Sequence, residues 1–151
     1  MNVLRRLFTD LEFAPRGHIL DVPFAVVGVR PAGASHSIYE ELWHLDDWQT
    51  FELRMARGHA VRSDYRGTSF PANPSPRREA DWHGLVEHFL DGSNQAAALA
   101  GDLERLEVPL ADGPTVRERL EMLAVHNAYH MGKIVLLRQL LGVWSAPLED
   151  A

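Results

Sequence analysis

Hydrophobic residues recur every three or four positions along most of this chain, which is the spacing of helices that bury one face. The first such stretch ends before Pro15, with apolar positions at i, i+3, i+4 and i+7. These positions are Leu4, Leu7, Phe8 and Leu11. A second stretch opens with a capping box, in which Ser37 and Glu40 each satisfy a free amide at a helix start. The two patterns predict one helix before Pro15 and another over about residues 37–57.

Two further helices are expected in the C-terminal half. One should begin near Ser75 and Pro76, because proline suits the first helical turn. Its apolar phase continues across residues 91–94, which favours one continuous helix over two short ones. The last helix starts at a second capping box, residues 115–118, and runs to Gly142. Its predicted buried line alternates steps of four and three: Val116, Leu120, Leu123, Asn127, His130, Ile134, Leu137 and Leu141.

The intervening segments are read as connections. Residues 21–29 are compatible with a short helix, and residues 59–75 form a long loop of the kind that serves as a crossover or a functional lid. Gly132 lies inside the last helix, which predicts that another helix packs closely there. No strand-like alternation or internal repeat competes with the helices. We therefore predict an all-α protein, a single domain over residues 1–151, folded as a four-helix bundle with long crossover connections.

Composition narrows the function. The 151 residues include 46% hydrophobic and 24% charged residues, as in an ordinary globular protein. A formal charge of −6 and the lack of a basic stripe argue against nucleic-acid binding. There is no cysteine, which excludes thiolate ligands and a cysteine nucleophile. No signal peptide or membrane-spanning run is recognisable, so we expect a soluble cytoplasmic protein without a membrane partner.

Two histidines on the predicted buried face of the last helix require partners. His126 and His130 are four positions apart, so their imidazoles lie close enough to share one ion. A hydrogen-bonded pair of core histidines is the alternative, and spacing alone does not choose between the two. His44, within the second helix, is a third inward-facing candidate. Asn127 stands where zinc proteases with an H-E-x-x-H motif carry their glutamate, which argues against a protease of that type.

Other ionisable residues receive simpler interpretations. The acidic residues of the second helix could support a ligand histidine, but a solvated helix face explains them better. These residues are Glu40, Glu41, Asp46 and Asp47. The five remaining histidines are read as surface or local capping residues: His18, His36, His59, His83 and His88.

The stretch "HSIYEELWHLDDWQ", followed far downstream by "HNAYHMGKIVLLRQLLG", resembles the DinB-like family. This is a damage-inducible four-helix-bundle superfamily that includes YfiT-type metal hydrolases, and it is unrelated to the DNA polymerase of the same name. The resemblance extends from about Arg30 to Gly142. It implies three metal ligands, which fall on His44, His126 and His130. Lys133 stands where relatives often carry glutamine.

The resemblance implies a divalent metal, with zinc or nickel favoured and iron also compatible with neutral imidazoles. It also implies a small-molecule substrate, a low-molecular-weight thiol of the bacillithiol or mycothiol type, a role in stress responses and a homodimer. Two function classes stay open from the sequence. One is a metal-dependent thiol transferase, or a related hydrolase, acting on small electrophiles. The other is a non-catalytic bundle in which a metal or a histidine network completes the core. No general base can be assigned.

Overall fold

The computed structural model describes residues 2–9, 14–59 and 70–145. Within these residues the chain is helical, and its only pairing of β type is an isolated bridge between Pro109 and Thr115. The elements are α1 (Val3–Thr9), α2 (Arg16–Leu20), the 3-10 helix η1 (Phe24–Val26), α3 (Ile38–Ala56), α4 (Glu79–Gly101), α5 (Leu103–Leu106) and α6 (Val116–Leu140).

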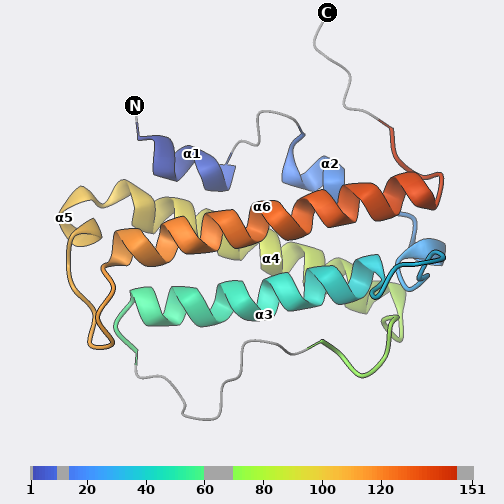
Figure 1. Cartoon of the computed structure of the whole chain (residues 1–151), viewed down its shortest axis with the longest axis horizontal. Coiled ribbons are helices and arrows are strands. Elements are labelled where there is room, and N and C mark those ends of the chain that lie inside the picture. Colours follow the sequence, from blue (N-terminus) through green and yellow to red (C-terminus); the bar gives the residue numbers. More distant parts are fainter. Residues whose placement is uncertain (1, 10–13, 60–69, 146–151) are drawn as a thin grey trace, which may run out of the picture.

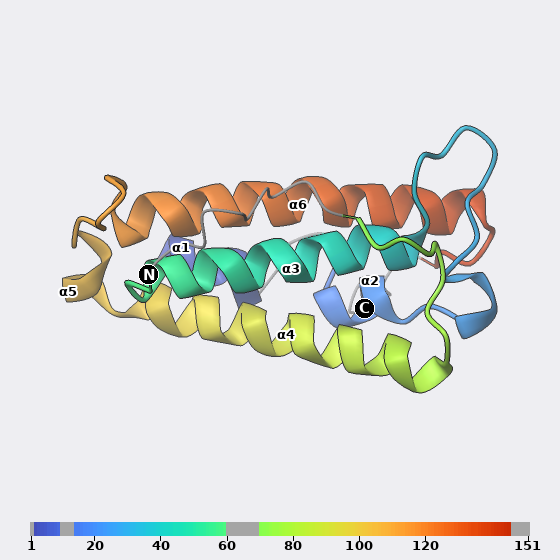
Figure 2. The same cartoon turned by 90° about the horizontal axis from the view of Figure 1, so that it is seen from below.

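The bundle has four helix positions, and single long helices occupy three of them. α3, α4 and α6 lie side by side, and the short helices α1 and α2 follow one another along the fourth position, where both contact α4 and α6 (Figures 1 and 2). α3 and α4 run in the same direction, so the chain between them crosses from one end of the bundle to the other (Figure 1). The all-α bundle with a long crossover connection is therefore confirmed.

The N-terminal region differs in detail from the prediction. α1 ends at Thr9, well before Pro15, and Leu11 lies outside the described residues. α2 was not expected from the pattern. Arg138 explains its placement, because its guanidinium donates to the carbonyls of His18 (2.5 Å) and Ile19 (2.9 Å). The predicted short helix over residues 21–29 is reduced to the single 3-10 turn η1.

Both predicted capping boxes are present. The Ser37 hydroxyl accepts from the Glu40 amide at 3.2 Å, and the Glu40 carboxylate accepts from the Ser37 amide at 2.8 Å. Thr115 and Glu118 make the same reciprocal pair at the start of α6. The start of the two helices that carry the histidines is thus fixed by local sequence.

The start of α4 is set by tertiary contacts, so the predicted start near Ser75 and Pro76 is wrong. α4 begins at Glu79. Ser75 instead packs on Gly28, where an added Cβ would lie 2.3 Å from the Ser75 Cβ. The Ser37 hydroxyl also donates to the Pro74 carbonyl at 2.5 Å. These contacts hold the residues before α4 against the start of α3, outside the helix.

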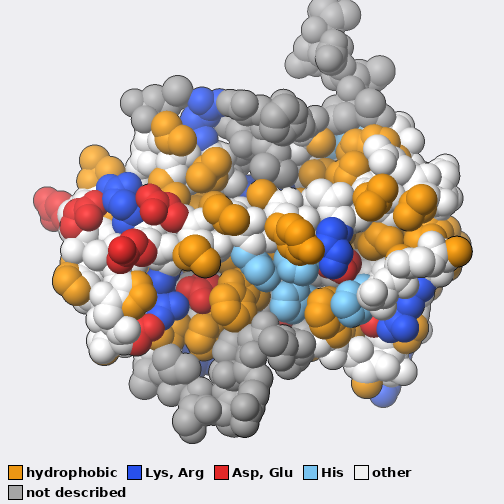
Figure 3. All heavy atoms as spheres, in the orientation of Figure 1, with side chains coloured by type: hydrophobic (Ala, Val, Ile, Leu, Met, Phe, Trp, Pro, Cys, Tyr) orange, Lys and Arg blue, Asp and Glu red, His pale blue; other side chains and the backbone are white. Residues whose placement is uncertain are grey.

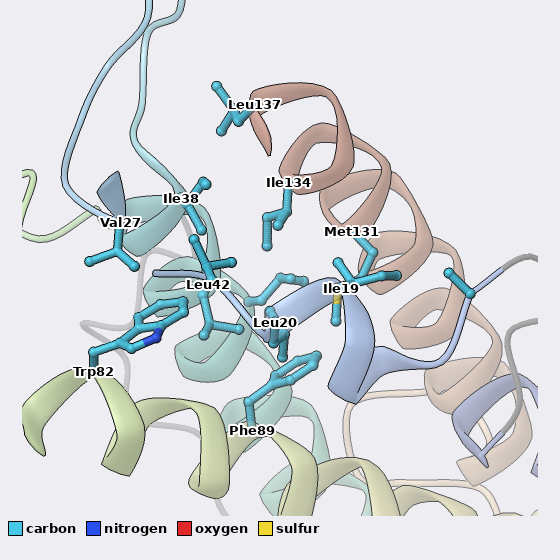
Figure 4. Packing of buried hydrophobic residues seen from close by; sticks show 13 residues of the cluster. Ile19, Leu20, Val27, Ile38, Leu42, Trp82, Phe89, Met131, Ile134 and Leu137 are labelled. Carbon is cyan, nitrogen blue, oxygen red and sulfur yellow. The ribbon is translucent and has the colours of Figure 1, made fainter. Parts of the chain in front are cut away.

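Two apolar clusters occupy the two ends of the bundle. One gathers Trp82, Phe89 and Ile134 around α2, and Figure 4 shows these side chains converging from several helices. The other contains Phe8 and Leu123 at the opposite end. The predicted buried line of α6 is confirmed from Val116 to Leu137, and Leu141 is half-buried. The prediction for Gly132 is wrong, since a Cβ added there would meet no atom within 4 Å.

A polar layer separates the two clusters. Gln49 of α3 donates to the Phe89 carbonyl at 2.8 Å and accepts from the Asn127 amide at 3.0 Å. Ser93 also donates to Gln49, at 3.3 Å. Gly92 makes room for this network, because a Cβ there would lie 2.3 Å from the Gln49 Nε2 atom. Gly92 and Ser93, in the middle of the continuous helix α4, thus make room for a buried amide and bind it.

The long helices are amphipathic rather than uniformly apolar. Even α6, with 25 residues, carries charged side chains along its whole length. Across the described part of the chain, no helix is both long enough and apolar enough to cross a membrane.

Candidate metal centre

Three histidines from two helices converge beside the polar layer. α3 contributes His44, and α6 contributes His126 and His130 one turn apart. One ring nitrogen of each lies within 4.8 Å of the others. The Nε2 atoms of His44 and His126 are 3.2 Å apart. The three predicted residues therefore lie close enough together to hold one metal ion.

The cluster opens onto one face of the molecule. His44 and His130 are each 7% exposed, and His126 is half-buried. Figure 3 shows histidine side chains gathered near the centre of the face formed by α3 and α6, with hydrophobic side chains around them. The rings are therefore held in packed surroundings while the point on which they converge lies near the surface.

Glu41 orients His130. Its carboxylate is 1% exposed and lies 2.5 Å from the His130 Nδ1 atom. Burial alone would raise the pKa of Glu41, but hydrogen bonds from His130 and Lys133 outweigh burial and hold this pKa below its ordinary value. The carboxylate is therefore ionised and accepts a hydrogen bond from the Nδ1–H group of His130. The Nε2 atom of His130 then keeps its lone pair for a ligand.

Lys133 and His36 contact the other oxygen of Glu41, and an aromatic ring packs on two of the histidines. Lys133 forms an ion pair with the Glu41 Oε1 atom, and the His36 Nδ1 atom lies 3.2 Å from the same oxygen. The Phe70 ring stacks on His36, with centroids 3.7 Å apart, and on His44, with centroids 4.6 Å apart. Phe70 thereby fixes the plane of the His44 ring from one side.

The protonation state of His126 suits a ligand. Burial, followed by charge repulsion from His130 and His44, lowers the pKa of His126 to about 4. The ring is neutral at pH 7, and the neutral imidazole is the form that binds metals.

The geometry fits a divalent ion. Two imidazole nitrogens bound tetrahedrally to one zinc ion would be about 3.3 Å apart, given Zn–N bonds of about 2.0–2.1 Å. The observed 3.2 Å between His44 and His126 agrees with this value. Among the described residues the buried His126 Nδ1 atom has no hydrogen-bond partner, and it is the ring nitrogen that does not face His44. The fit to an ion therefore rests on the Nε2 atoms, and the Nδ1 atom does not contribute to it.

The acidic residues of α3 divide into two groups. The interpretation of a solvated face is wrong for Glu40 and Glu41, which are both 1% exposed. Glu40 pairs with Arg30 and caps α3. Asp46 accepts from His88 at 2.7 Å, away from the cluster.

Of the five histidines read as surface or capping residues, His36 alone approaches the triad, through Glu41 and Phe70. His59 and His83 are exposed, and each contacts its own helix neighbourhood, at Arg54 and Glu79. His18 contacts the Ser145 carbonyl at 2.7 Å, and exposed His88 pairs with Asp46. Sequence reasoning thus missed Glu41, Lys133, His36 and Phe70 as parts of the site.

The fold and the site define a class of protein: an all-α bundle in which two helices bring three histidines together at one face. The profile of the DinB superfamily matches residues 16–134, which is most of the chain. The chain therefore belongs to the DinB superfamily. The match begins earlier than the resemblance around Arg30 indicated, so it includes α2. No curated protein and no solved structure matches the chain.

Proposed function

We propose that His44, His126 and His130 bind a divalent metal ion and that the protein is a metal-dependent thiol S-transferase acting on small electrophilic molecules. The observation that carries this proposal is the place where the three rings converge, near the surface between α3 and α6. A site with three protein nitrogens leaves further positions for a water or a thiol, which is the arrangement of catalytic rather than structural zinc sites.

The metal, when bound, supplies Lewis-acid chemistry that favours the deprotonated form of a thiol or water. The protein's own groups orient this chemistry. Glu41 holds His130 in the tautomer that presents Nε2, and Phe70 holds the His44 ring by stacking. In the transfer, the thiol proton leaves to solvent, its sulfur forms a bond to the electrophilic carbon, and a halide departs with the electron pair of the broken bond.

Several finer features of the proposal rest on the family. A thiol of the bacillithiol or mycothiol type is the cosubstrate, zinc or nickel is the metal ahead of iron, and the protein acts in the cytoplasm during stress. A homodimer is expected as well, which sedimentation of the purified protein tests. Hydrolysis of the electrophile by water is the related alternative activity.

Elemental analysis tests the metal site first. We expect close to one metal ion per chain in the wild type and loss of that ion in His44→Ala and His130→Ala. A wild type that holds no metal after reconstitution would contradict the site and favour the alternative, in which the histidines form a hydrogen-bonded part of the core. The same measurement identifies the metal.

A thiol screen then separates the function classes. The metal-loaded protein is mixed with a reactive alkyl halide and with bacillithiol, mycothiol or glutathione, and halide release is measured. Release that depends on one thiol and is absent in His130→Ala supports the transferase. Release with water alone indicates the hydrolase, and no release despite a bound ion favours a non-catalytic bundle.

A further inference from the structure

A pocket of about 340 Å³ lies next to the histidine cluster, between the segment before α3 and the C-terminal half of α6. It begins at Glu41 and Lys133, and Glu41 is also the residue that holds His130. Lys133 lies three residues after His130 and Leu140 lies ten residues after it, so the pocket lining extends along α6 to about 15 Å from the cluster at 1.5 Å per residue. The pocket thus adjoins the candidate metal centre through Glu41, which lines the pocket and contacts His130.

The α6 wall of this pocket is apolar. Leu136, Leu137 and Leu140 line it from α6, while the opposite segment contributes Ala34 together with the polar Ser35 and His36. Leu136 and Leu140 are 53% and 57% exposed, so hydrocarbon surface is open to a ligand here. Exposed leucines that line a concave site favour burial of an apolar ligand group.

The ionisable groups that line the pocket are paired with one another. Lys133 and His36 contact one oxygen of the Glu41 carboxylate, and His130 contacts the other. The charge of Lys133 is therefore already matched by that of Glu41. The volume suits about ten non-hydrogen atoms, if each needs about the 30 Å³ of a water molecule. The leucine wall therefore fits a neutral hydrocarbon group better than an anionic group.

We propose that this pocket binds the hydrocarbon part of the electrophile whose reactive end lies at the histidine cluster, and that it selects substrates with a neutral alkyl chain of several carbons. The assignment rests on the proposed function for the reactive end only. The pocket itself is defined by the leucines of α6, the segment before α3 and the Lys133–Glu41 pair.

Alkyl hydroxamates test this assignment, because their head group binds zinc and their tail length can be varied. Dissociation constants of aceto-, butano-, hexano- and octanohydroxamate are measured on zinc-loaded protein by calorimetry. We expect affinity to rise about threefold to fourfold per added methylene until the pocket is filled, and then to level off. Equal affinity for all tail lengths would overturn the proposal.

Matched variants locate the tail. Leu136→Asp and Leu140→Asp place a charge in the pocket at positions that are more than half exposed, so folding should be preserved. Val125→Asp places the same charge on α6 on the other side of the cluster, at a position that is 68% exposed. The gain with tail length should vanish in the two leucine variants and persist in Val125→Asp. The reverse pattern would place the tail elsewhere and refute the assignment.

A second probe keeps this inference separate from the metal. If acetohydroxamate fails to bind, the proposed metal function has failed, and the pocket is then judged by hexan-1-ol on chelator-treated protein. Saturable chemical-shift changes of the Leu136 and Leu140 methyl groups would support the pocket. Absence of such changes, with no tail-length effect, would overturn it.

Discussion

Substitution of Glu41 by glutamine tests how the protein prepares His130 for a ligand. Glutamine keeps the size and an acceptor oxygen but removes the charge that strengthens the hydrogen bond from His130 Nδ1, which lies 2.5 Å from the carboxylate oxygen. Loss of such a supporting carboxylate typically lowers metal affinity by about 10- to 100-fold, or roughly 1.4–2.7 kcal/mol. Because Glu41 is 1% exposed and contacts His130 directly, we expect the effect in Glu41→Gln to lie within this range.

Lys133 gives this prediction a second part. In Glu41→Gln its ammonium loses its partner and remains close to the bound cation. Lys133 is 35% exposed, so it can partly turn to solvent, and its repulsion should be modest. We therefore expect the double variant with Lys133→Gln to bind zinc more tightly than Glu41→Gln alone.

The assay is zinc titration in competition with a chelator of known affinity at pH 7.5, with helical content checked by circular dichroism. Glu52→Gln is the matched control, because Glu52 is another buried carboxylate of α3 and pairs with Arg119 at 2.8 Å rather than with a histidine. Its affinity for zinc should match that of the wild type. Unchanged affinity in Glu41→Gln, or an equal loss in both variants, would refute the role given to Glu41.

Three other predictions concern the scaffold. Gly92→Ala should lower the free energy of unfolding in urea by about 1–3 kcal/mol, because its Cβ displaces Gln49 from a buried network; a gain in stability would contradict this. In chelator-treated protein, stability should fall as the pH drops from 6.5 to 4, since His126 has a lowered pKa in the folded state and only the unfolded state takes up the proton. Urea titrations of His126→Gln at both pH values should show a smaller fall. Arg138→Ala should destabilise the fold by about 2–4 kcal/mol in thermal or urea unfolding, because three backbone carbonyls lose a buried donor, and an unchanged transition would argue against that clamp.

The sequence predicted best those features that depend on local interactions. α3 and α6 begin where their capping boxes are, because the side chains of Ser37 and Thr115 satisfy amides three residues away. The start of α4 was misplaced because Ser75 packs on Gly28, a contact between residues that are 47 positions apart. Similarly, α2 is held by Arg138 from the far end of the chain. No window of local sequence contains such contacts.

The candidate site also combines features that local sequence predicts with features that depend on distant contacts. Helical spacing placed His126 and His130 together and made His44 a candidate on the second helix, and the family resemblance joined the three as one ligand set. The role of Glu41 depends on how α3 and α6 are aligned, since only this alignment brings its carboxylate to His130 and Lys133. A usable signal was present, because Glu41 precedes His44 by three residues and so shares its side of the helix.

X-ray absorption spectroscopy at the metal edge tests most directly whether the three imidazoles bind one ion. The zinc-reconstituted protein should show a shell containing three histidine nitrogens at about 2.0–2.1 Å, completed by one or two light atoms from solvent. The outer-shell scattering typical of imidazole should decrease in His44→Ala. A spectrum with fewer than three imidazoles in the wild type, or one that His44→Ala leaves unchanged, would contradict the metal centre on which the proposed function depends.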